Sequence, residues 1–214
     1  MTGFELLTKA TQSVNFRALF TGRLWGRTGC STNSTGKFIC ATGDSGSGQI
    51  SCDDVGGIIL LFTLVEFTLA EKGDRDYYDI CLVDGFNVPV SISPRGGSGN
   101  TCITASCARD VNSDCPNELA VKGQSGNSVI GCKNACEVFN QPEYCCTESS
   151  STPNTCKPTN YSMFFKNQCH QAYSCPYDHS TSCFLAPVEL IIISLFVQME
   201  ESIIGVGSTA PLVF

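Results

Sequence analysis

Two acidic residues of the sequence occur where a β-hairpin would bring their side chains together. Residues 62–70 alternate in character, so that Val65 and Phe67 can face a core while Glu66 faces the opposite side. After a break at residues 72–74, the segment 78–82 repeats the alternation, with Asp79 on the outer face. A turn centred between residues 72 and 73 would place Glu66 directly opposite Asp79, with Cβ atoms roughly 4.5–5.5 Å apart.

Opposed carboxylates repel each other, so one of the two is expected to hold its proton unless a nearby cation compensates. A protonated carboxyl beside an ionised one is the arrangement in which a glycosidase sets its general acid and its partner. The same pair can bind sugar hydroxyls without reaction. The alternative is a pair of solvated carboxylates on a sheet surface, as charged residues usually are.

Cysteine is the second chemically informative residue, because the chain has 15 cysteines and only 2 histidines. No two cysteines have the C-x-x-C spacing of a zinc knuckle or a thioredoxin-like redox site, so we expect no metal and no cofactor. This density indicates disulfides formed in an oxidising compartment. Because the number is odd, at least one thiol has no partner within the chain.

Charge and hydropathy exclude two classes of partner. Lys and Arg number 13 against 20 Asp and Glu, a net charge of −7, whereas nucleic-acid binding needs clustered basic residues. The longest apolar stretches, 58–65 and 190–197, are far shorter than the roughly 18 residues that predict a membrane span. Residues 1–7 have neither the basic nor the long apolar region of a signal peptide, which conflicts with the cysteine content.

The elements that must position these residues fall into two regions. Residues 4–101 are typical of β-strands, including a strand at 86–92 whose Pro89 indicates a sheet edge or strand end. From Cys102 onward, cysteines alternate with Gly and Pro turn residues, which predicts a loop-rich lobe stapled by disulfides. Short helices are expected at 133–139 and 161–168.

Several motifs resemble, in order and spacing, those of thaumatin-like proteins, the plant pathogenesis-related family that includes osmotin. The main one runs from Gly36 to Asp44 and continues with Gly46 and Cys52. The others are the segments 22–30, 64–69, 78–89, 144–146 and 164–169. The resemblance covers about residues 2–182.

The resemblance implies a mainly β fold, with a thaumatin-like β-sandwich core, a disulfide-rich lobe of loops and short helices, and an acidic cleft between them. The thaumatin-like domain would span 1–182, with the β core at 1–101 and the lobe and its return to the core at 102–182. Residues 183–214 would form a C-terminal tail outside the family pattern.

The resemblance also implies a function: a monomeric, extracellular plant defence protein with antifungal activity that binds β-1,3-glucan of fungal cell walls. Weak endo-β-1,3-glucanase activity is left open, with Glu66 as general acid and Asp79 or Asp84 as base or nucleophile. The alternatives are a structural or sweet-tasting type of member without glucan function, and a non-functional truncated remnant. The family's cleft residues correspond here to Arg23, Glu66, Asp79, Asp84 and Asp178.

The family pattern implies five disulfides, for which Cα separations of roughly 4.4–6.8 Å are expected. These are Cys30–Cys40, Cys107–Cys169, Cys115–Cys132, Cys136–Cys145 and Cys146–Cys156. Ser45 stands where the family has the cysteine that would pair with Cys52. Cys81 and Cys175 have no family counterpart, and pairing of Cys102 with Cys183 is left undecided.

Both ends depart from the family. The N-terminus looks truncated, and the first strand's cysteine and its bridge to the end of the chain are missing. For the apolar segment 190–197 we expect a loosely attached helix or a disordered tail, and the alternative is a buried strand that occupies a vacated sheet edge. Two glycosylation sequons, at Asn33 and Asn160, matter only if the chain enters the secretory pathway.

Overall fold

The main sheet joins strands from the two ends and the middle of the chain. The computed structural model describes residues 2–7, 9–52, 63–71, 74–94, 102–187, 191–194 and 202–208. Within them, seven strands form this sheet. Its order is β1 (Gly3–Leu6), β14 (Ser202–Ser208), β2 (Thr21–Arg27), β5 (Leu64–Thr68), β6 (Arg75–Cys81) and β11 (Ala172–Tyr173), with β12 (Phe184–Pro187) also paired to β6.

A second sheet, in the order β13 (Ile191–Ser194), β7 (Val90–Pro94) and β8 (Ala105–Cys107), completes the sandwich. One buried cluster joins the two sheets, with Val65 and Ile80 from the main sheet and Val90, Ile92 and Ala105 from the second. Side chains of alternating strand positions fill this interior, as the sequence pattern predicts. The expected mainly β fold class with a sandwich core is therefore confirmed.

Strand β7 begins later than the sequence pattern indicates. The predicted strand spans 86–92, but Phe86 makes only an isolated bridge to Cys132, and β7 starts at Val90. Pro89 immediately precedes it. Because proline has no N–H to donate, it stands at the start of a strand more readily than inside one.

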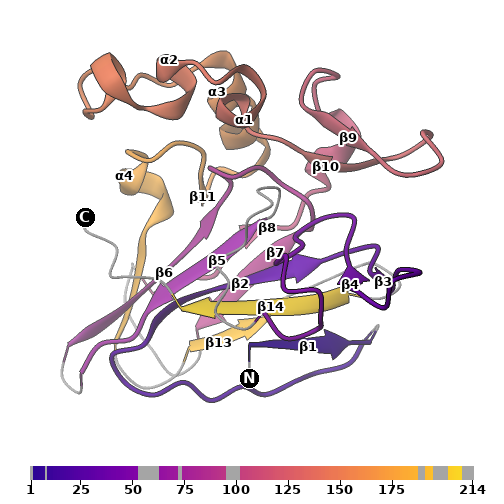
Figure 1. Cartoon of the computed structure of the whole chain (residues 1–214). Coiled ribbons are helices and arrows are strands. Elements are labelled where there is room, and N and C mark those ends of the chain that lie inside the picture. The colour runs from indigo at the N-terminus through magenta and orange to yellow at the C-terminus, as the bar shows by residue number, and fades with distance from the viewer. Residues whose placement is uncertain are drawn as a thin grey trace.

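The cysteine-rich lobe lies above the sheets (Figure 1). It contains a hairpin of β9 (Ala120–Lys122) and β10 (Val129–Cys132) and the helices α1 (Ala135–Phe139), α2 (Pro142–Cys145) and α3 (Asn160–Gln168). Short 3-10 turns lie at Val111–Asp114 and Glu148–Ser150, and α4 (His179–Ser182) leads back to the sheet. Helices α1 and α3 match the two predicted helices within two residues.

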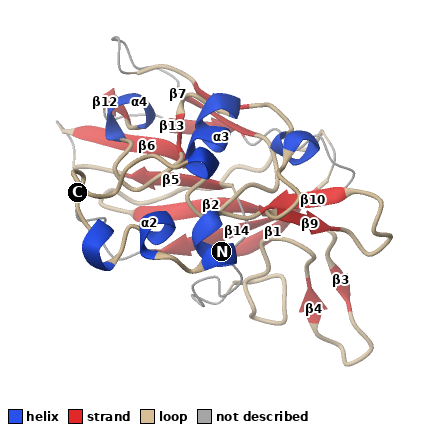
Figure 2. Ribbon diagram, turned by 90° about the horizontal axis from the view of Figure 1, so that it is seen from above, coloured by secondary structure: helices blue, strands red, loops and turns tan. Residues whose placement is uncertain are grey.

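A small arm projects from one corner of the molecule and is formed by β3 (Ser31–Thr32) and β4 (Phe38–Ile39) (Figure 2). The two strands pair in antiparallel register, with Ser31 opposite Ile39. Cys30 and Cys40 therefore occupy the next opposed positions, where a disulfide closes the base of the arm.

All five disulfides implied by the family pattern are present. Four have Cα separations of 4.7–5.8 Å, within the expected range. The Cys30–Cys40 separation of 3.9 Å is shorter than expected, and this bridge joins directly opposed residues of a narrow hairpin. The cysteines outside any disulfide are Cys52, Cys81, Cys102, Cys175 and Cys183.

The C-terminal segment corrects one expectation. A loose helix or disordered tail is wrong for the parts described, since 191–194 and 202–208 form strands β13 and β14. Strand β13 pairs with β7 at the edge of the second sheet, so the alternative of a strand is confirmed for residues 191–194. Strand β14 lies between β1 and β2, where it satisfies the backbone groups of both neighbours.

Candidate functional site

Three charged residues form one row across the middle of the main sheet. Arg23 on β2 lies opposite Glu66 on β5, and Glu66 lies opposite Asp79 on β6. The cross-strand pairing of Glu66 and Asp79 expected from the sequence is confirmed. Because the three side chains project from the same face, their charges act on one another.

The arginine is bonded to only one of the two carboxylates. Arg23 Nε donates to Glu66 Oε1 at 2.6 Å, with 36% of the arginine side chain and 10% of the glutamate side chain exposed. Asp79 is buried, and its Oδ1 has no hydrogen-bond partner in the described part of the chain. The Arg23 guanidinium therefore pairs directly with the Glu66 carboxylate and acts on Asp79 only at longer range.

The pKa of Asp79 is raised well above its ordinary value. Burial is the largest cause, since it penalises the charged form, and the nearby Glu66 carboxylate adds to it. The Arg23 guanidinium opposes both. Asp79 thus holds its proton to a higher pH than a solvated aspartate, which is the outcome expected for one member of an opposed pair.

Asp84 extends the acidic row beyond the end of β6. Its pKa is also raised, mainly by burial, with Arg23 acting in the opposite direction and the carboxylates of Glu66 and Glu137 adding to the rise. Asp84 is close enough to Arg23 and Glu66 for the charges of both to act on it. Arg23, Glu66, Asp79 and Asp84 are therefore gathered at one site.

Glu137 is a lobe residue that sequence reasoning missed. It lies on α1, receives a 2.6 Å bond from Lys133 Nζ through Oε1, and has a buried Oε2 without a partner among the described residues. Its carboxylate lies on the lobe and acts on Asp84. In the sequence, Glu137 stands three residues after Asn134, the cap of the helix. That spacing predicts the start of a helix, but it does not indicate that Glu137 lies near the acidic residues of the sheet.

Asp178, the fifth residue of the implied set, is bonded to other residues of the segment 166–181. Its Oδ2 forms a 2.8 Å ion pair with Lys166 and accepts a hydrogen bond from the Ser174 hydroxyl. Its Oδ1 accepts from Thr181. These contacts tie Asp178 to α3 and α4, and its part in the cleft stays a prediction.

The face that carries the acidic row is more enclosed than the outer face of a solvated sheet. Tyr173, Cys81 and Cys183 belong to a second cluster on this side of the sheet, and Glu66 is only 8% exposed. Burial, together with Glu66, Asp79 and Asp84, raises the pKa of the Cys81 thiol well above its ordinary value. The solvated alternative for the two carboxylates is thus wrong.

Trp25 is a core residue and no platform for a sugar ring. It is 4% exposed, and its Nε1 donates to the Gly43 carbonyl at 2.9 Å. On the far side of β2, Gly205 pairs with Trp25 and Gly207 with Arg23. The position of β14 beside Arg23 is thus a glycine, which adds no side chain to the acidic row.

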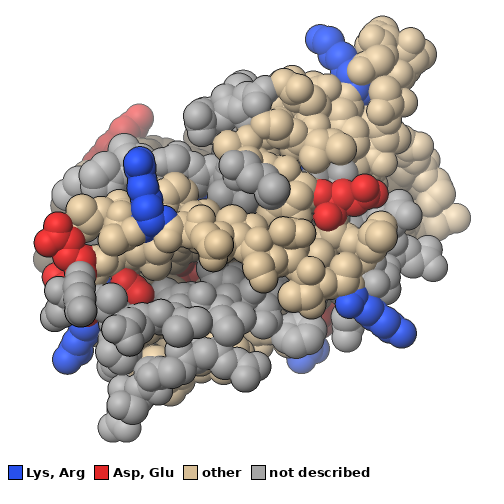
Figure 3. Space-filling view, turned by 90° about the horizontal axis from the view of Figure 1, so that it is seen from below, with Lys and Arg blue, Asp and Glu red and all other residues tan. Residues whose placement is uncertain are grey.

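Other parts of the described structure provide fewer groups for binding or catalysis. A partly open pocket of about 40 Å³ lies between Val83, which follows β6, and the lobe residues Tyr144 and Cys175, and it has room for water only. No cluster of three His, Cys, Asp or Glu that could hold a metal ion occurs in the part of the chain described. On the face seen from below, acidic and basic side chains stand apart from one another (Figure 3).

None of the helices within the described ranges is both long enough and apolar enough to cross a bilayer.

Comparison with known proteins identifies the family. Residues 1–192 match the Thaumatin family. "Thaumatin-like protein 1" of Pyrus pyrifolia is 55% identical over 183 residues, which are 86% of this chain and 74% of that protein. A protein of Prunus avium named "Glucan endo-1,3-beta-glucosidase" is 50% identical, with the same coverage. "Pathogenesis-related protein 5" of Arabidopsis thaliana is 47% identical over 85% of this chain and 73% of that protein. The chain belongs to the thaumatin family.

Proposed function

We propose that this protein is an extracellular plant defence protein whose acidic cleft binds β-1,3-glucan. The observation that carries the proposal is the row of Arg23, Glu66 and Asp79, with one carboxylate paired to arginine and the other unpaired and buried. A glucan is uncharged, so it cannot form ion pairs, and its hydroxyls must donate to or accept from such groups. The names of relatives from Arabidopsis thaliana and Prunus avium support the defence role and the glucan.

The row supplies both kinds of hydrogen-bonding group that a polyol needs. Glu66, bonded to Arg23 through Oε1, offers a charged acceptor, and Arg23 is exposed enough to donate to a sugar oxygen. Asp79 in its protonated form donates an O–H. Hydrogen bonds to charged groups contribute roughly 1.5–3 kcal/mol each, which is about a 10- to 150-fold effect on affinity.

Hydrolysis of the same glucan is a second candidate function, favoured by the raised pKa of Asp79. A general acid must hold a proton near its working pH, and Asp79 meets that requirement better than an ordinary aspartate. This gives Asp79 the acid's role and Glu66 the role of nucleophile or base, the reverse of the assignment made from sequence. Directly opposed positions favour the short carboxyl separation of retaining enzymes, about 5–5.5 Å.

Retention on insoluble laminarin tests the proposal. The refolded wild type should bind, and Glu66→Gln should bind at least about 10-fold more weakly, because the charged acceptor is lost. Glu118→Gln is the matched control, since Glu118 is an exposed lobe residue bonded to Tyr161. Failure of the wild type to bind, or equal binding by Glu66→Gln, would refute glucan binding at this site.

Asp79→Asn separates the two candidates. The amide keeps a hydrogen-bond donor but has no proton to give to a leaving group. Release of reducing ends by the wild type and its loss in Asp79→Asn, with binding retained, would establish hydrolysis. No release by either protein would leave binding alone as the function.

A further inference from the structure

Two N-glycosylation sequons, Asn33-Ser34-Thr35 and Asn160-Tyr161-Ser162, lie in very different surroundings. The first is at the tip of the arm formed by β3 and β4. The second begins helix α3. A transferase needs an extended or turned acceptor segment that it can bind. The hydroxyl of the third residue must also make no bonds to residues outside the sequon, so the two sequons can be compared.

The Asn33 sequon forms an isolated turn. Asn33 Oδ1 accepts from the backbone N–H of Thr35 at 3.0 Å, from the Thr35 hydroxyl at 2.7 Å and from the Lys37 N–H at 3.0 Å. This is an Asx-type turn, in which the side chain imitates a backbone turn. With Oδ1 directed inward to three donors, the planar amide must direct Nδ2 the other way.

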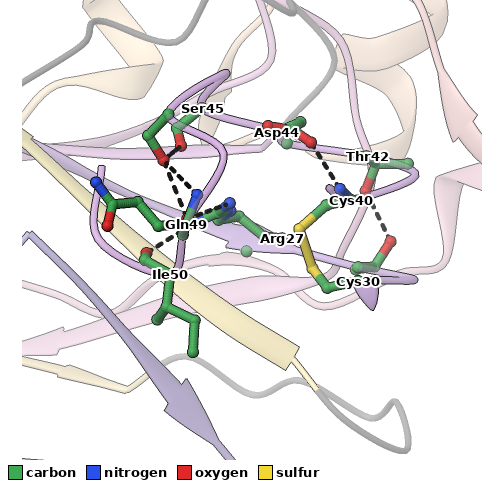
Figure 4. Close-up of a disulfide and its surroundings, with 12 residues drawn as sticks. Arg27, Cys30, Cys40, Thr42, Asp44, Ser45, Gln49 and Ile50 are labelled. Carbon is green, nitrogen blue, oxygen red and sulfur yellow. Dashed lines mark hydrogen bonds between the residues drawn. A yellow bond between two sulfur atoms is a disulfide. The ribbon is translucent and has the colours of Figure 1, made fainter. Parts of the chain in front are cut away.

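The arm also presents this turn away from the rest of the molecule. Ser34, Thr35 and Gly36 are exposed, and a Cβ placed on Gly36 would meet no atom within 4 Å. The Cys30–Cys40 disulfide closes the base of the arm, beside Thr42 and Asp44 (Figure 4). The turn is thus built from local contacts and remains accessible after the sandwich has folded.

The Asn160 sequon has its hydroxyl committed to the helix. Ser162 Oγ accepts from the Thr159 N–H at 2.8 Å and donates to the Thr159 carbonyl at 3.1 Å, and Thr159 Oγ1 accepts from the Ser162 N–H. This capping box stabilises the first turn of α3. The middle residue, Tyr161, packs against Phe139 and Tyr144. A transferase would have to unwind this turn.

We propose that Asn33 is the N-glycan acceptor of this protein and that Asn160 is not modified. The inference depends on the extracellular location included in the proposed function. The donor is an oligosaccharide linked to a polyprenyl diphosphate. A bond forms between Asn33 Nδ2 and the anomeric carbon, the bond from that carbon to the diphosphate oxygen breaks, the diphosphate leaves, and the amide loses one proton.

The test uses the full chain behind a cleavable signal peptide, translated with microsomes that carry out glycosylation. Protection from added protease selects the molecules that have entered the lumen. The expected result is one glycosylated species that peptide-N-glycosidase converts to the bare chain, with aspartate found at position 33 by peptide mass spectrometry. Asn33→Gln and Thr35→Ala should lose the glycan, whereas Thr35→Ser and the control Asn160→Gln should keep it.

Protected chains that carry no glycan, or a glycan that persists in Asn33→Gln and disappears in Asn160→Gln, would overturn the proposal. Glycan mass and laminarin retention are independent measurements. A protein that is glycosylated at Asn33 but does not bind laminarin would refute the proposed function and leave the acceptor site intact.

Discussion

Restoring the missing cysteine at position 45 should add a sixth disulfide. Ser45 and Cys52 are both buried, and the chain between them bends back on itself through a 2.6 Å bond from the Ser47 hydroxyl to the Ser51 carbonyl. Arg27 holds the same loop through the Ile50 carbonyl at 2.8 Å (Figure 4). In Ser45→Cys, the new thiol is expected to bond to Cys52.

The magnitude follows from the loop that the bond would close. A loop of about eight residues removes about 2.5 kcal/mol of unfolded-chain entropy. Replacing Ser45 also removes its 3.0 Å contact with the Ser47 hydroxyl, at a cost of about 1 kcal/mol. The net gain of roughly 1.5 kcal/mol should raise Tm by about 3–6 °C for a chain of this size.

Thiol titration and thermal unfolding together check this expectation. Thiol titration of the denatured, unreduced wild type should find the five thiols of Cys52, Cys81, Cys102, Cys175 and Cys183. The Ser45→Cys variant should show one fewer, and adding Cys52→Ala should abolish the gain in Tm. If the bond forms and Tm does not rise, the reasoning from loop entropy is wrong. If no bond forms, the two positions are not within bonding reach.

Three further predictions concern the acidic row and the backbone. Because the folded-state pKa of Asp79 is raised, the stability that it contributes is fully present below the ordinary aspartate pKa of about 3.9 and is lost as pH rises through the folded-state pKa. Asp79→Asn should therefore gain stability over the wild type as pH increases, and urea midpoints that run parallel from pH 4 to 8 would contradict this. Arg23→Gln should raise the pKa of Asp79 further, since the one group that lowers it is removed; a carboxyl carbon NMR titration measures the direction, and a fall would refute it. Gly43→Ala should destabilise the fold by more than the 1–2 kcal/mol typical of a left-handed residue, because its Cβ would lie 2.5 Å from the Gly26 carbonyl oxygen. Gly36→Ala, with a similar φ and open space, is the control in urea unfolding, and equal losses would show that the contact does not matter.

Local pattern predicted the parts of the fold that depend on neighbouring residues. The alternation in β5 and β6 placed Glu66 opposite Asp79. Strand β14 could not be found in this way, because Gly205 and Gly207 lower its strand propensity and its neighbours β1 and β2 are far away in sequence.

The residues of the site could be predicted from the sequence. Which carboxylate pairs with the arginine could not. The family pattern supplied Arg23 and the acidic residues, but which carboxylate the arginine holds depends on side-chain geometry across the strands. Glu137 acts on Asp84 only because the lobe folds over the sheet. A contact between segments so distant in sequence has no local signature.

The position of β14 between β1 and β2 sets the order in which the protein can assemble. The hairpin of β5 and β6 closes a loop of 9 residues from Thr68 to Tyr77, whereas β1 meets β14 at Leu6 and Ser202, 196 residues apart. The entropy of loop closure makes the second step costlier by roughly 3 kcal/mol. On the ribosome, the edge of β2 must wait until residues 202–208 have been synthesised. During that interval its unpaired N–H and C=O groups are open to strands of other chains, so aggregation of nascent protein competes with completion of the sheet.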